Sequence, residues 1–229
     1  MVEAGYVELA LTGVHTGSFG HDRNGTDSSP TELVDLLAQL EGVDGLQRIR
    51  LNSVEPNFVT DELIGFAAHS SHLCRHYHIP LQSGDDTVLR RMGRRYDRQH
   101  YADRIQRLAD TVPGACIGAD VMVGFPGETS EDFAETRTLL ADLPVSYFHV
   151  FPFSLRQNTP AERMGGHIAP EVKQERGAIL RSLSQRKQRM FQEQFLGSTR
   201  TVLLEAPKPD GRMGGFTDNY LRVELEHGS

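Results

Sequence analysis

The sequence contains no tryptophan, only two cysteines and no long apolar run. A helix that crosses a membrane needs roughly 20 consecutive apolar residues, and no stretch of this chain provides them. The first residues also lack the basic and then apolar pattern of a secretory signal peptide. We therefore expect a cytoplasmic protein that does not contact a membrane.

The few cysteines also limit the metal chemistry of the chain. Cys74 and Cys116 lie far apart in the sequence and lack the spacing of metal ligands. Two thiolates are too few for an iron–sulfur cluster held by cysteine alone, and a reducing compartment disfavours a disulfide. We interpret both as buried, small apolar residues. His76 and His78 share one face of a strand, but no third ligand has suitable spacing, so we predict no metal site.

Acidic residues outnumber lysine and arginine, and many of the basic residues lie in two groups. The net charge of −7 argues against a protein that coats nucleic acid through a generally basic surface. The two groups are Arg90, Arg91, Arg94, Arg95 and Arg98, and then Arg176, Arg181, Arg186, Lys187 and Arg189. Clustered arginine indicates contact with phosphate, of a cofactor or of a nucleic acid backbone. It is equally typical of solvated helix faces that pair with acids, and both interpretations stay open.

Strand and helix patterns alternate along most of the chain. A length of 229 residues, with 38% hydrophobic and 24% charged residues, fits one large α/β domain with or without a small appendage. Apolar or alternating runs predict strands at 6–14, 48–53, 76–81, 117–123 and 147–153. Amphipathic patterns predict a helix that starts at 29–32 and ends at 42, and helices over 61–69, 86–92, 98–111, 131–143 and 171–195. This order predicts a parallel sheet with right-handed crossovers, followed after residue 197 by short β-strands.

An open doubly wound sheet and a (βα) barrel fit this periodicity equally well. Each strand is followed by its own polar cluster: His15 and Thr16; Asn52, Ser53 and Glu55; Gln82, Ser83 and Asp85; Asp120 and Glu128; Ser154 and Arg156. Polar loops at every strand end favour a barrel, in which all βα loops face one site. This rim lacks a nucleophile motif or a phosphate-binding lysine. It suits a cofactor that carries the chemistry itself, although each residue taken alone also fits a solvated loop.

The stretch IGADVMVGFPGET at 117–129 shows this organisation most clearly. A buried strand runs into a glycine-rich turn, and a charged helix pattern follows at once. Gly124 and Gly127 permit backbone angles that other residues resist and let a ligand approach the main chain. Glu128 and backbone N–H groups then lie at the carboxyl end of a parallel strand, where α/β proteins bind ligands. A tight connection without a ligand is the alternative.

Several longer strings of the sequence resemble one known family. The chain is similar to the radical-SAM methylthiotransferases in LTGVHTGSFG (11–20), RIRLNSVEP (48–56), HIPLQSGDDTVLRRMGRRY (78–96), GADVMVGFPGET (118–129), HVFPFSLRQNTPAERM (149–164) and GGFTDNYLRVE (214–224). The resemblance implies an α/β fold, with a parallel partial (βα) barrel of the TIM type that holds strands two to six over residues 1–196. The start of a small β module of the TRAM kind would follow over 197–229. The family's N-terminal domain and its C-x3-C-x2-C cluster motif are expected to be absent.

Within this family, the strings resemble most the branch that adds a methylthio group to N6-threonylcarbamoyladenosine at position 37 of tRNA. The resemblance implies S-adenosylmethionine and [4Fe–4S] clusters as cofactors. A cluster iron reduces S-adenosylmethionine to a 5′-deoxyadenosyl radical, which takes hydrogen from C2 of the adenine ring. Because these residues hold no cluster ligands, we expect part of a transferase that is inactive alone. A sister enzyme for isopentenyladenosine or a ribosomal protein, and a non-catalytic RNA-binding fragment, are the alternatives.

The resemblance also implies roles for individual positions. Gln82 and Ser83 match a ribose-contacting position, residues 118–128 match the segment that lines the adenine, and Arg95 could pair with the methionyl carboxylate. The implied S-adenosylmethionine site contains Gln82, Ser83, Gly118, Asp120, Val123, Gly124, Pro126, Glu128, His15, Glu55 and Arg95. The implied contacts with tRNA, at its anticodon loop, come from Arg91, Arg94, Thr217, Asn219, Tyr220 and Arg222. We expect a monomer.

Overall fold

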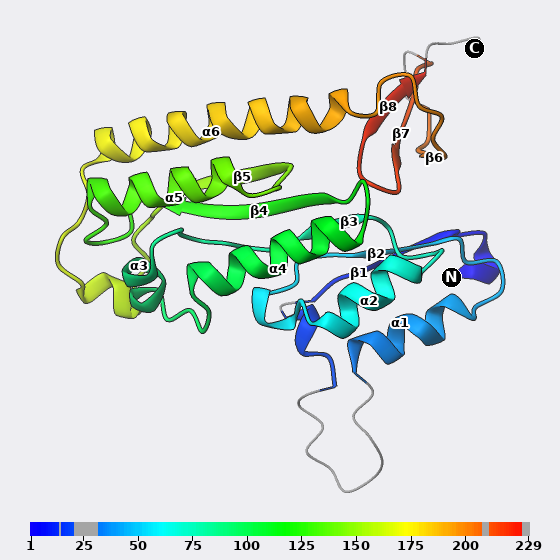
Figure 1. Ribbon diagram of the computed structural model, residues 1–229, viewed down its shortest axis with the longest axis horizontal. Helices are drawn as coiled ribbons and strands as arrows, with labels where there is room; N and C mark the ends of the chain where they lie inside the picture. The colour runs from blue at the N-terminus through cyan, green and yellow to red at the C-terminus, as the bar shows by residue number, and fades with distance from the viewer. Residues whose placement is uncertain (14, 21–31, 208–210, 226–229) are drawn as a thin grey trace, which may run out of the picture.

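The computed structural model describes residues 1–13, 15–20, 32–207 and 211–225 (Figure 1). Its five parallel strands form a two-stranded part and a three-stranded part: β1 (Glu8–Leu11) and β2 (Arg48–Leu51), then β3 (His76–His78), β4 (Cys116–Val123) and β5 (Tyr147–Pro152). The α-helices are α1 (Leu33–Glu41), α2 (Asp61–His69), α3 (Asp86–Arg91), α4 (Arg98–Thr111), α5 (Ser130–Asp142) and α6 (Pro170–Glu193). The predicted alternation is confirmed, and the predicted helix start at 29–31 lies outside the described residues.

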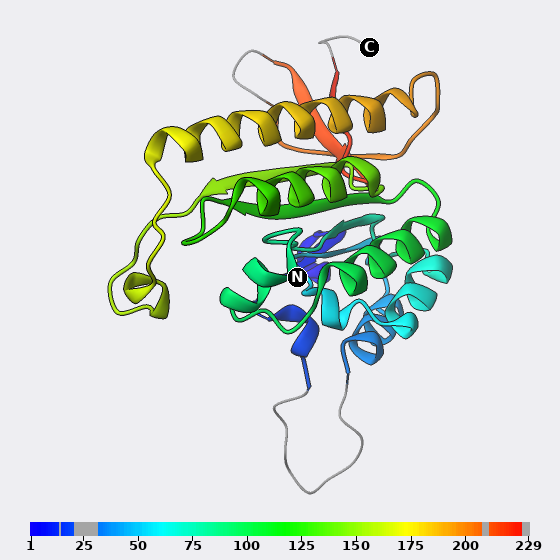
Figure 2. The same cartoon turned by 60° about the vertical axis from the view of Figure 1, so that its left-hand side comes forward.

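The parallel strands follow one another in chain order across the sheet. β1 pairs with β2, and β3, β4 and β5 pair in succession. The two parts join beside β3, where Ile49 N donates to His72 O at 2.8 Å and Cys74 N donates to Ile49 O at 2.8 Å. Within the described residues no further strand pairs with β1 or β5. The sheet is therefore a partial barrel with an open side (Figure 2), and the predicted parallel α/β fold is confirmed.

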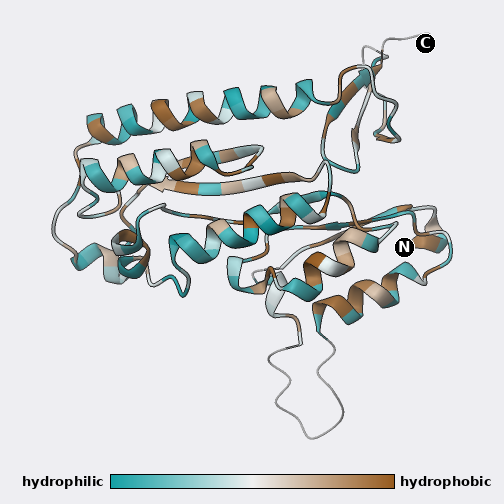
Figure 3. Cartoon of the chain, viewed as in Figure 1, coloured by the Kyte–Doolittle hydropathy of each residue, from teal (hydrophilic) through white to brown (hydrophobic). Residues whose placement is uncertain are grey.

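The hydrophobic core lies between this sheet and the helices. Successive side chains of a strand face opposite sides of a sheet, and Ile49, Leu51, Ile117 and Val121 are buried completely on the helix side. The outward face of α4 is hydrophilic, whereas its buried Tyr101 joins the core (Figure 3). The other side of the sheet is left for the polar residues of the strands. Across the described residues, none of the helices combines the length and the apolar character of a transmembrane segment.

Capping residues fix the starts of four of the helices. The side chains of Thr60, Asp85, Asp97 and Thr129 accept backbone N–H groups from the first turns of α2, α3, α4 and α5. Asp85 belongs to a polar cluster that was predicted at the rim, so its carboxylate has a structural role. Because the strands are parallel, their carboxyl ends and the loops that follow them lie at one rim.

A small antiparallel sheet follows α6. Its strands are β6 (Val202–Leu204), β7 (Met213–Thr217) and β8 (Arg222–Leu225), with β7 in the centre. The predicted short strands after residue 197 are confirmed, whereas the division into two domains at this residue stays a prediction. This C-terminal module, residues 199–207 and 211–225, lies beside the amino ends of the parallel strands (Figure 1). Arg48 of β2 reaches it and donates to Phe216 O at 3.0 Å.

Candidate cofactor-binding site

A row of polar side chains crosses the concave face of the partial barrel. His78 Nε2 of β3 lies 3.1 Å from Asp120 Oδ2 of β4. His149 of β5 is the register partner of Asp120, and its ring centroid lies 5.8 Å from that of His78. Toward the carboxyl ends, Met122 and Phe151 are register partners on the same face. Polar groups beside apolar surface are the usual lining of a small-molecule site.

An aromatic stack forms the floor of this concave face, at the amino ends of β3 and β5. Gly118 has no side chain, and a Cβ there would lie 2.5 Å from Tyr147 Cζ, so the tyrosine ring covers this position. Tyr147 OH lies 2.8 Å from His76 Nε2, and the His76 ring stacks on Tyr220 with 4.1 Å between centroids. Burial lowers the pKa of His76 to about 3, and Arg50 adds to this effect. His76 is therefore a neutral part of the floor, and Gly118 makes room for a protein side chain.

Two basic side chains lie against the glycine-rich loop that follows β4. Gly124 and Gly127 have φ values of 74° and 78°, which favour glycine. A Cβ on Gly124 would lie 2.2 Å from Lys173 Cγ, and one on Gly127 would lie 1.9 Å from Arg91 Nη1. The glycines were predicted to let a ligand approach the main chain. In the structure, the side chains of Lys173 of α6 and Arg91 of α3 occupy the space beside these two glycines.

The carboxylate of Glu128 is engaged inside the same loop. Gly124 N donates to Glu128 Oε2 at 2.7 Å, and Arg176 Nη1 of α6 donates to the Glu128 carboxylate and, at 3.2 Å, to its carbonyl oxygen. Glu128 and Arg176 are only 2% and 7% exposed. Burial raises the pKa of Glu128, and the Gly124 N–H and Arg176 oppose this. Val123 and Pro126 are buried too, so the loop contributes backbone and shape to the rim.

Gln82 stands at the end of β3 with an unusual backbone conformation. Its φ is 66°, positive for a residue other than glycine. Hydrogen bonds from Gln82 N to Asp120 O and from Met122 N to Gln82 O hold it there, at 2.8 and 2.9 Å. Its side-chain amide makes no hydrogen bond within the described residues, whereas the buried Ser83 hydroxyl lies 3.3 Å from Thr136 Oγ1. Backbone strain of this kind is typical of ligand sites, so Gln82 is the better ligand-binding candidate of the predicted pair.

A polar cleft of about 490 Å³ brings four predicted residues together at the ends of β1 and β2. It is lined by His15, Glu55, Arg94 and Arg95, among others. The Glu55 carboxylate lies 3.7 Å from His15 Nδ1 and 3.5 Å from Arg94 Nη1. Arg95 is exposed and forms no ion pair with the residues that the structure describes. A carboxylate beside an unpaired guanidinium suits a ligand that carries an ammonium and a carboxylate group.

The residues predicted to contact RNA lie in two places. Arg91 and Arg94 are at the rim, whereas the others belong to the C-terminal module. Thr217 and Asn219 are buried and joined at 2.7 Å, and Asn219 Nδ2 donates to Gly114 O of the barrel at 3.1 Å. Tyr220 packs on His76 and keeps 40% of its surface exposed, and Arg222 is exposed. Contact of these residues with RNA stays a prediction.

Sequence reasoning missed several residues of the concave face. His149, Met122 and Phe151 follow the same period-two alternation that places His76 and His78 on one face, so the pattern contained the necessary signal. The position of Lys173 over Gly124 had no such signal, because it depends on how α6 packs across the sheet.

The described residues do not fit an iron–sulfur cluster. Cys74 and Cys116 are both buried, and burial raises the pKa of their thiols to about 11 and about 12. No group of three or more His, Cys, Asp or Glu side chains in the described part of the chain is arranged to hold a metal ion. A nucleoside cofactor with an amino-acid tail fits better, since the free Gln82 amide and the charged cleft offer matching groups.

Comparison with curated proteins gives long matches. The chain is 39% identical to threonylcarbamoyladenosine tRNA methylthiotransferase MtaB of Bacillus subtilis, over 97% of this chain and 49% of that protein. It is 36% identical to the protein of the same name from Thermotoga maritima, over 98% and 50%. It is 34% identical to tRNA-2-methylthio-N(6)-dimethylallyladenosine synthase of Desulfitobacterium hafniense, over 97% and 49%. The chain thus spans about half the length of the curated relatives it matches.

The fold gives a consistent result. The structure of the radical S-adenosylmethionine methyltransferase TsrM from Kitasatospora setae superposes with a TM-score of 0.51 at 16% identity, over 66% of this chain and 28% of that one. Residues 12–140, more than half of the chain, match the Radical SAM superfamily. This match runs from the end of β1 into α5 and includes the rim with Glu55, Gln82 and Glu128. The chain therefore belongs to the radical SAM superfamily.

Proposed function

We propose that this chain is the cofactor-binding part of an enzyme that converts N6-threonylcarbamoyladenosine at position 37 of tRNA to its 2-methylthio derivative. The main support is the 39% identity to a relative named for this modification, which extends over 97% of the chain. The similarity thus includes the C-terminal module as well as the barrel. The proposal requires that the iron–sulfur ligands come from outside the residues present here.

The rim offers a place for each end of S-adenosylmethionine. Glu55 and Arg95 would bind the ammonium and carboxylate of the methionyl end in the charged cleft. Gln82 and Asp120 would bind the ribose and adenine, next to the apolar side chain of Met122. S-adenosylmethionine, when bound and reduced, supplies the radical that removes a hydrogen atom from the substrate. The chain itself positions the cofactor, and the buried Glu128–Arg176 pair fixes the loop against it.

The partly exposed arginines of the rim are the proposed contacts with tRNA. Arg91 and Arg94 would meet backbone phosphates near the anticodon loop, since arginine binds phosphate through paired N–H donors. Arg222 would do so on the C-terminal module. Thr217 and Asn219 would support this contact indirectly, by holding the module in place. We propose that the enzyme works as a monomer in the cytoplasm, where tRNA is available.

The nucleosides of tRNA test the proposed function directly. Cells that lack the gene encoding this chain should lose 2-methylthio-N6-threonylcarbamoyladenosine and accumulate the nucleoside without the methylthio group. Mass spectrometry of digested tRNA measures both, and the wild-type gene should restore the modification. Retention of the modified nucleoside in the deletion strain would refute the proposed substrate.

A matched pair of variants tests the role of Gln82 in the same enzyme. Gln82→Asn keeps a residue type that tolerates positive φ but shortens the amide by one methylene group. Loss of one hydrogen bond to the cofactor should raise the KM for S-adenosylmethionine by about tenfold. Gln39→Asn makes the same change on the exposed face of α1 and should leave the KM unchanged. Equal KM values for the two variants would remove Gln82 from the site.

One sister reaction has specific support. The Desulfitobacterium hafniense relative, named for dimethylallyladenosine, is 34% identical over 97% of the chain. If the chain acts on that nucleoside, the deletion strain loses 2-methylthio-N6-dimethylallyladenosine and keeps the threonylcarbamoyl derivative. The same mass spectra therefore distinguish the two substrates.

A further inference from the structure

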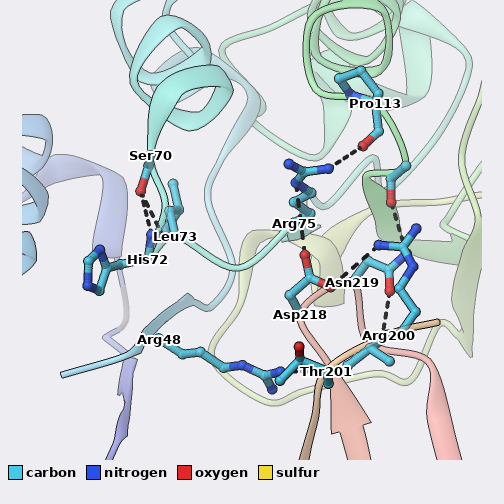
Figure 4. A network of polar contacts seen from close by, with 12 residues as sticks. Arg48, Ser70, His72, Leu73, Arg75, Pro113, Arg200, Thr201, Asp218 and Asn219 are labelled. Carbon is cyan, nitrogen blue, oxygen red and sulfur yellow. Dashed lines mark hydrogen bonds and ion pairs between the residues drawn. The ribbon is translucent and has the colours of Figure 1, made fainter. Parts of the chain in front are cut away.

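A second polar cleft lies far from the rim, between the amino ends of β2 and β3 and the C-terminal module (Figure 4). We call it the interdomain cleft. Its volume is about 440 Å³, and its charged or hydroxyl-bearing lining includes Arg48, Ser71, His72, Arg75, Arg200 and Asp218. Arg75 directly precedes β3, whereas Arg200 and Asp218 belong to the C-terminal module. Both walls of the cleft therefore contribute a guanidinium group.

The charges in the interdomain cleft do not cancel. One carboxylate, that of Asp218, lies between the two guanidinium groups, 3.9 Å from Arg75 Nε and 3.8 Å from Arg200 Nη1. These separations are longer than hydrogen bonds. Arg48 Nη1 lies 3.7 Å from Glu8, which pairs more closely with Arg50 at 3.0 Å, and His72 Nδ1 lies 3.6 Å from Glu41. Arg75, Arg200 and Asp218 together thus leave one excess positive charge, which equals the charge that one phosphodiester group neutralises.

Both guanidinium groups keep free donors. The Arg200 Cζ lies 4.5 Å above the ring centroid of Phe195, so the guanidinium is packed by its face and its N–H edges are left open. Arg200 donates no hydrogen bond within the described residues. Arg75 uses Nη1 for Pro113 O at 3.2 Å. The Arg200 side chain is 29% exposed and the Arg75 side chain is 44% exposed, so a ligand can reach both from solvent.

We propose that the interdomain cleft binds a phosphodiester group of the tRNA backbone between Arg75 and Arg200. Guanidinium groups match phosphate oxygens through paired N–H donors, and Asp218 holds the two arginines in place until phosphate displaces it. The identity of the ligand as tRNA rests on the proposed function. A phosphate contact carries no base information, so this site contributes affinity and orientation, while selection of the nucleoside belongs to the rim.

A substitution of Asp218 can show whether the cleft binds phosphate or only attaches the C-terminal module to the barrel. If Asp218 serves only to attach the module to the barrel, removing its charge loosens the module and can only weaken RNA binding. If the cleft is a phosphate site, the same change removes an anion that competes with phosphate. Asp218→Asn keeps the size of the side chain and should therefore strengthen RNA binding several-fold.

The experiment measures the binding of the purified chain to a fluorescently labelled RNA hairpin with the sequence of an anticodon arm, by anisotropy over a series of salt concentrations. Arg75→Gln and Arg200→Gln should each weaken binding by about tenfold, and the double variant should reduce the salt slope by about 1. Arg75→Lys should recover part of the loss, since it keeps the charge. The control is Arg107→Gln on α4, an arginine that is 52% exposed and paired with Asp61, which should bind like wild type.

Hydrogen exchange of β7 in each variant reports whether the module stays docked. Unchanged affinity in the double arginine variant, or weaker binding by Asp218→Asn with a docked module, would overturn the proposal. Failure of the wild-type chain to bind the hairpin would overturn it as well. The proposed function is judged separately, by the tRNA nucleosides of the deletion strain, so either one can fail alone.

Discussion

Acidification should destabilise the protein through the buried His76. Its ring is 7% exposed, stacks on Tyr220 and shares a hydrogen bond with Tyr147. Burial, with help from Arg50, lowers the pKa of this group from 6.5 to about 3. In the unfolded chain the imidazole takes up a proton as the pH falls below 6.5, and in the folded chain it stays neutral. The unfolded state therefore binds more protons between these two values, and stability is lost as the pH falls.

The size of this effect follows from the two pKa values of His76. Between about pH 7.5 and about pH 5, this residue alone should lower the free energy of unfolding by about 2 kcal/mol. Urea denaturation at both pH values measures the change in wild type and in His76→Gln, which keeps a polar side chain but does not titrate. The difference in stability between the two proteins should shift by that amount, whatever the other groups contribute.

A third variant identifies the physical cause of the lowered pKa. Tyr147→Phe removes the hydrogen-bond partner of His76 but leaves its burial, so it should keep most of the pH dependence while lowering stability at every pH. If His76→Gln has the same pH dependence as wild type, the argument from burial is wrong. If Tyr147→Phe abolishes the dependence, the hydrogen bond and not burial is its main cause.

Three further predictions follow, two from the packing of side chains and one from the small number of cysteines. Gly118→Ala should cost about 1–3 kcal/mol in urea denaturation, because the new methyl group displaces the Tyr147 ring. Gly65→Ala, in a helix with open space around it, should instead stabilise by about 0.5–1 kcal/mol, and equal effects would contradict the steric argument. Arg176→Met should cost about 3–5 kcal/mol by leaving a buried carboxylate unpaired, and adding Glu128→Gln should recover part of that loss; a purely additive double variant would deny the coupling. Anaerobic reconstitution of this chain with iron and sulfide should give no [4Fe–4S] absorbance, and a stoichiometric cluster that disappears on replacement of either cysteine would refute this.

The strand and helix order was predictable because its signals are local. The run 117–123 is apolar, contains β-branched residues and ends in a glycine-rich turn, which favours a buried strand, and Thr129 caps the helix that follows. The rim was predictable for a similar reason, since parallel strands bring their carboxyl ends together. The side chains that surround the rim loops could not be predicted from the sequence. Gly124 and Gly127 were expected to admit a ligand, yet Lys173 and Arg91 occupy that space, and both come from helices distant in the sequence.

The C-terminal module shows the same limit more strongly. The resemblance to the family implied RNA contact for Thr217, Asn219 and Tyr220. In the folded chain Asn219 bonds to Gly114, which lies 105 positions away, and Arg50 donates to Thr217 O across 167 positions. Polar side chains can bond to water, to RNA or to the protein itself. Only the folded arrangement decides among these partners.

The sequence by itself determined the parallel α/β class, the strand ends that form the rim, and the lack of thiolates for an iron–sulfur cluster. These depend on residue type and local spacing, which do not change when the chain folds. Only the tertiary structure decided that Glu128 anchors a loop to Arg176, that Tyr220 completes the floor of the barrel, and that Arg75 and Arg200 face each other across a cleft. Each of these contacts joins elements far apart along the chain, and their distances arise from packing that no local pattern encodes.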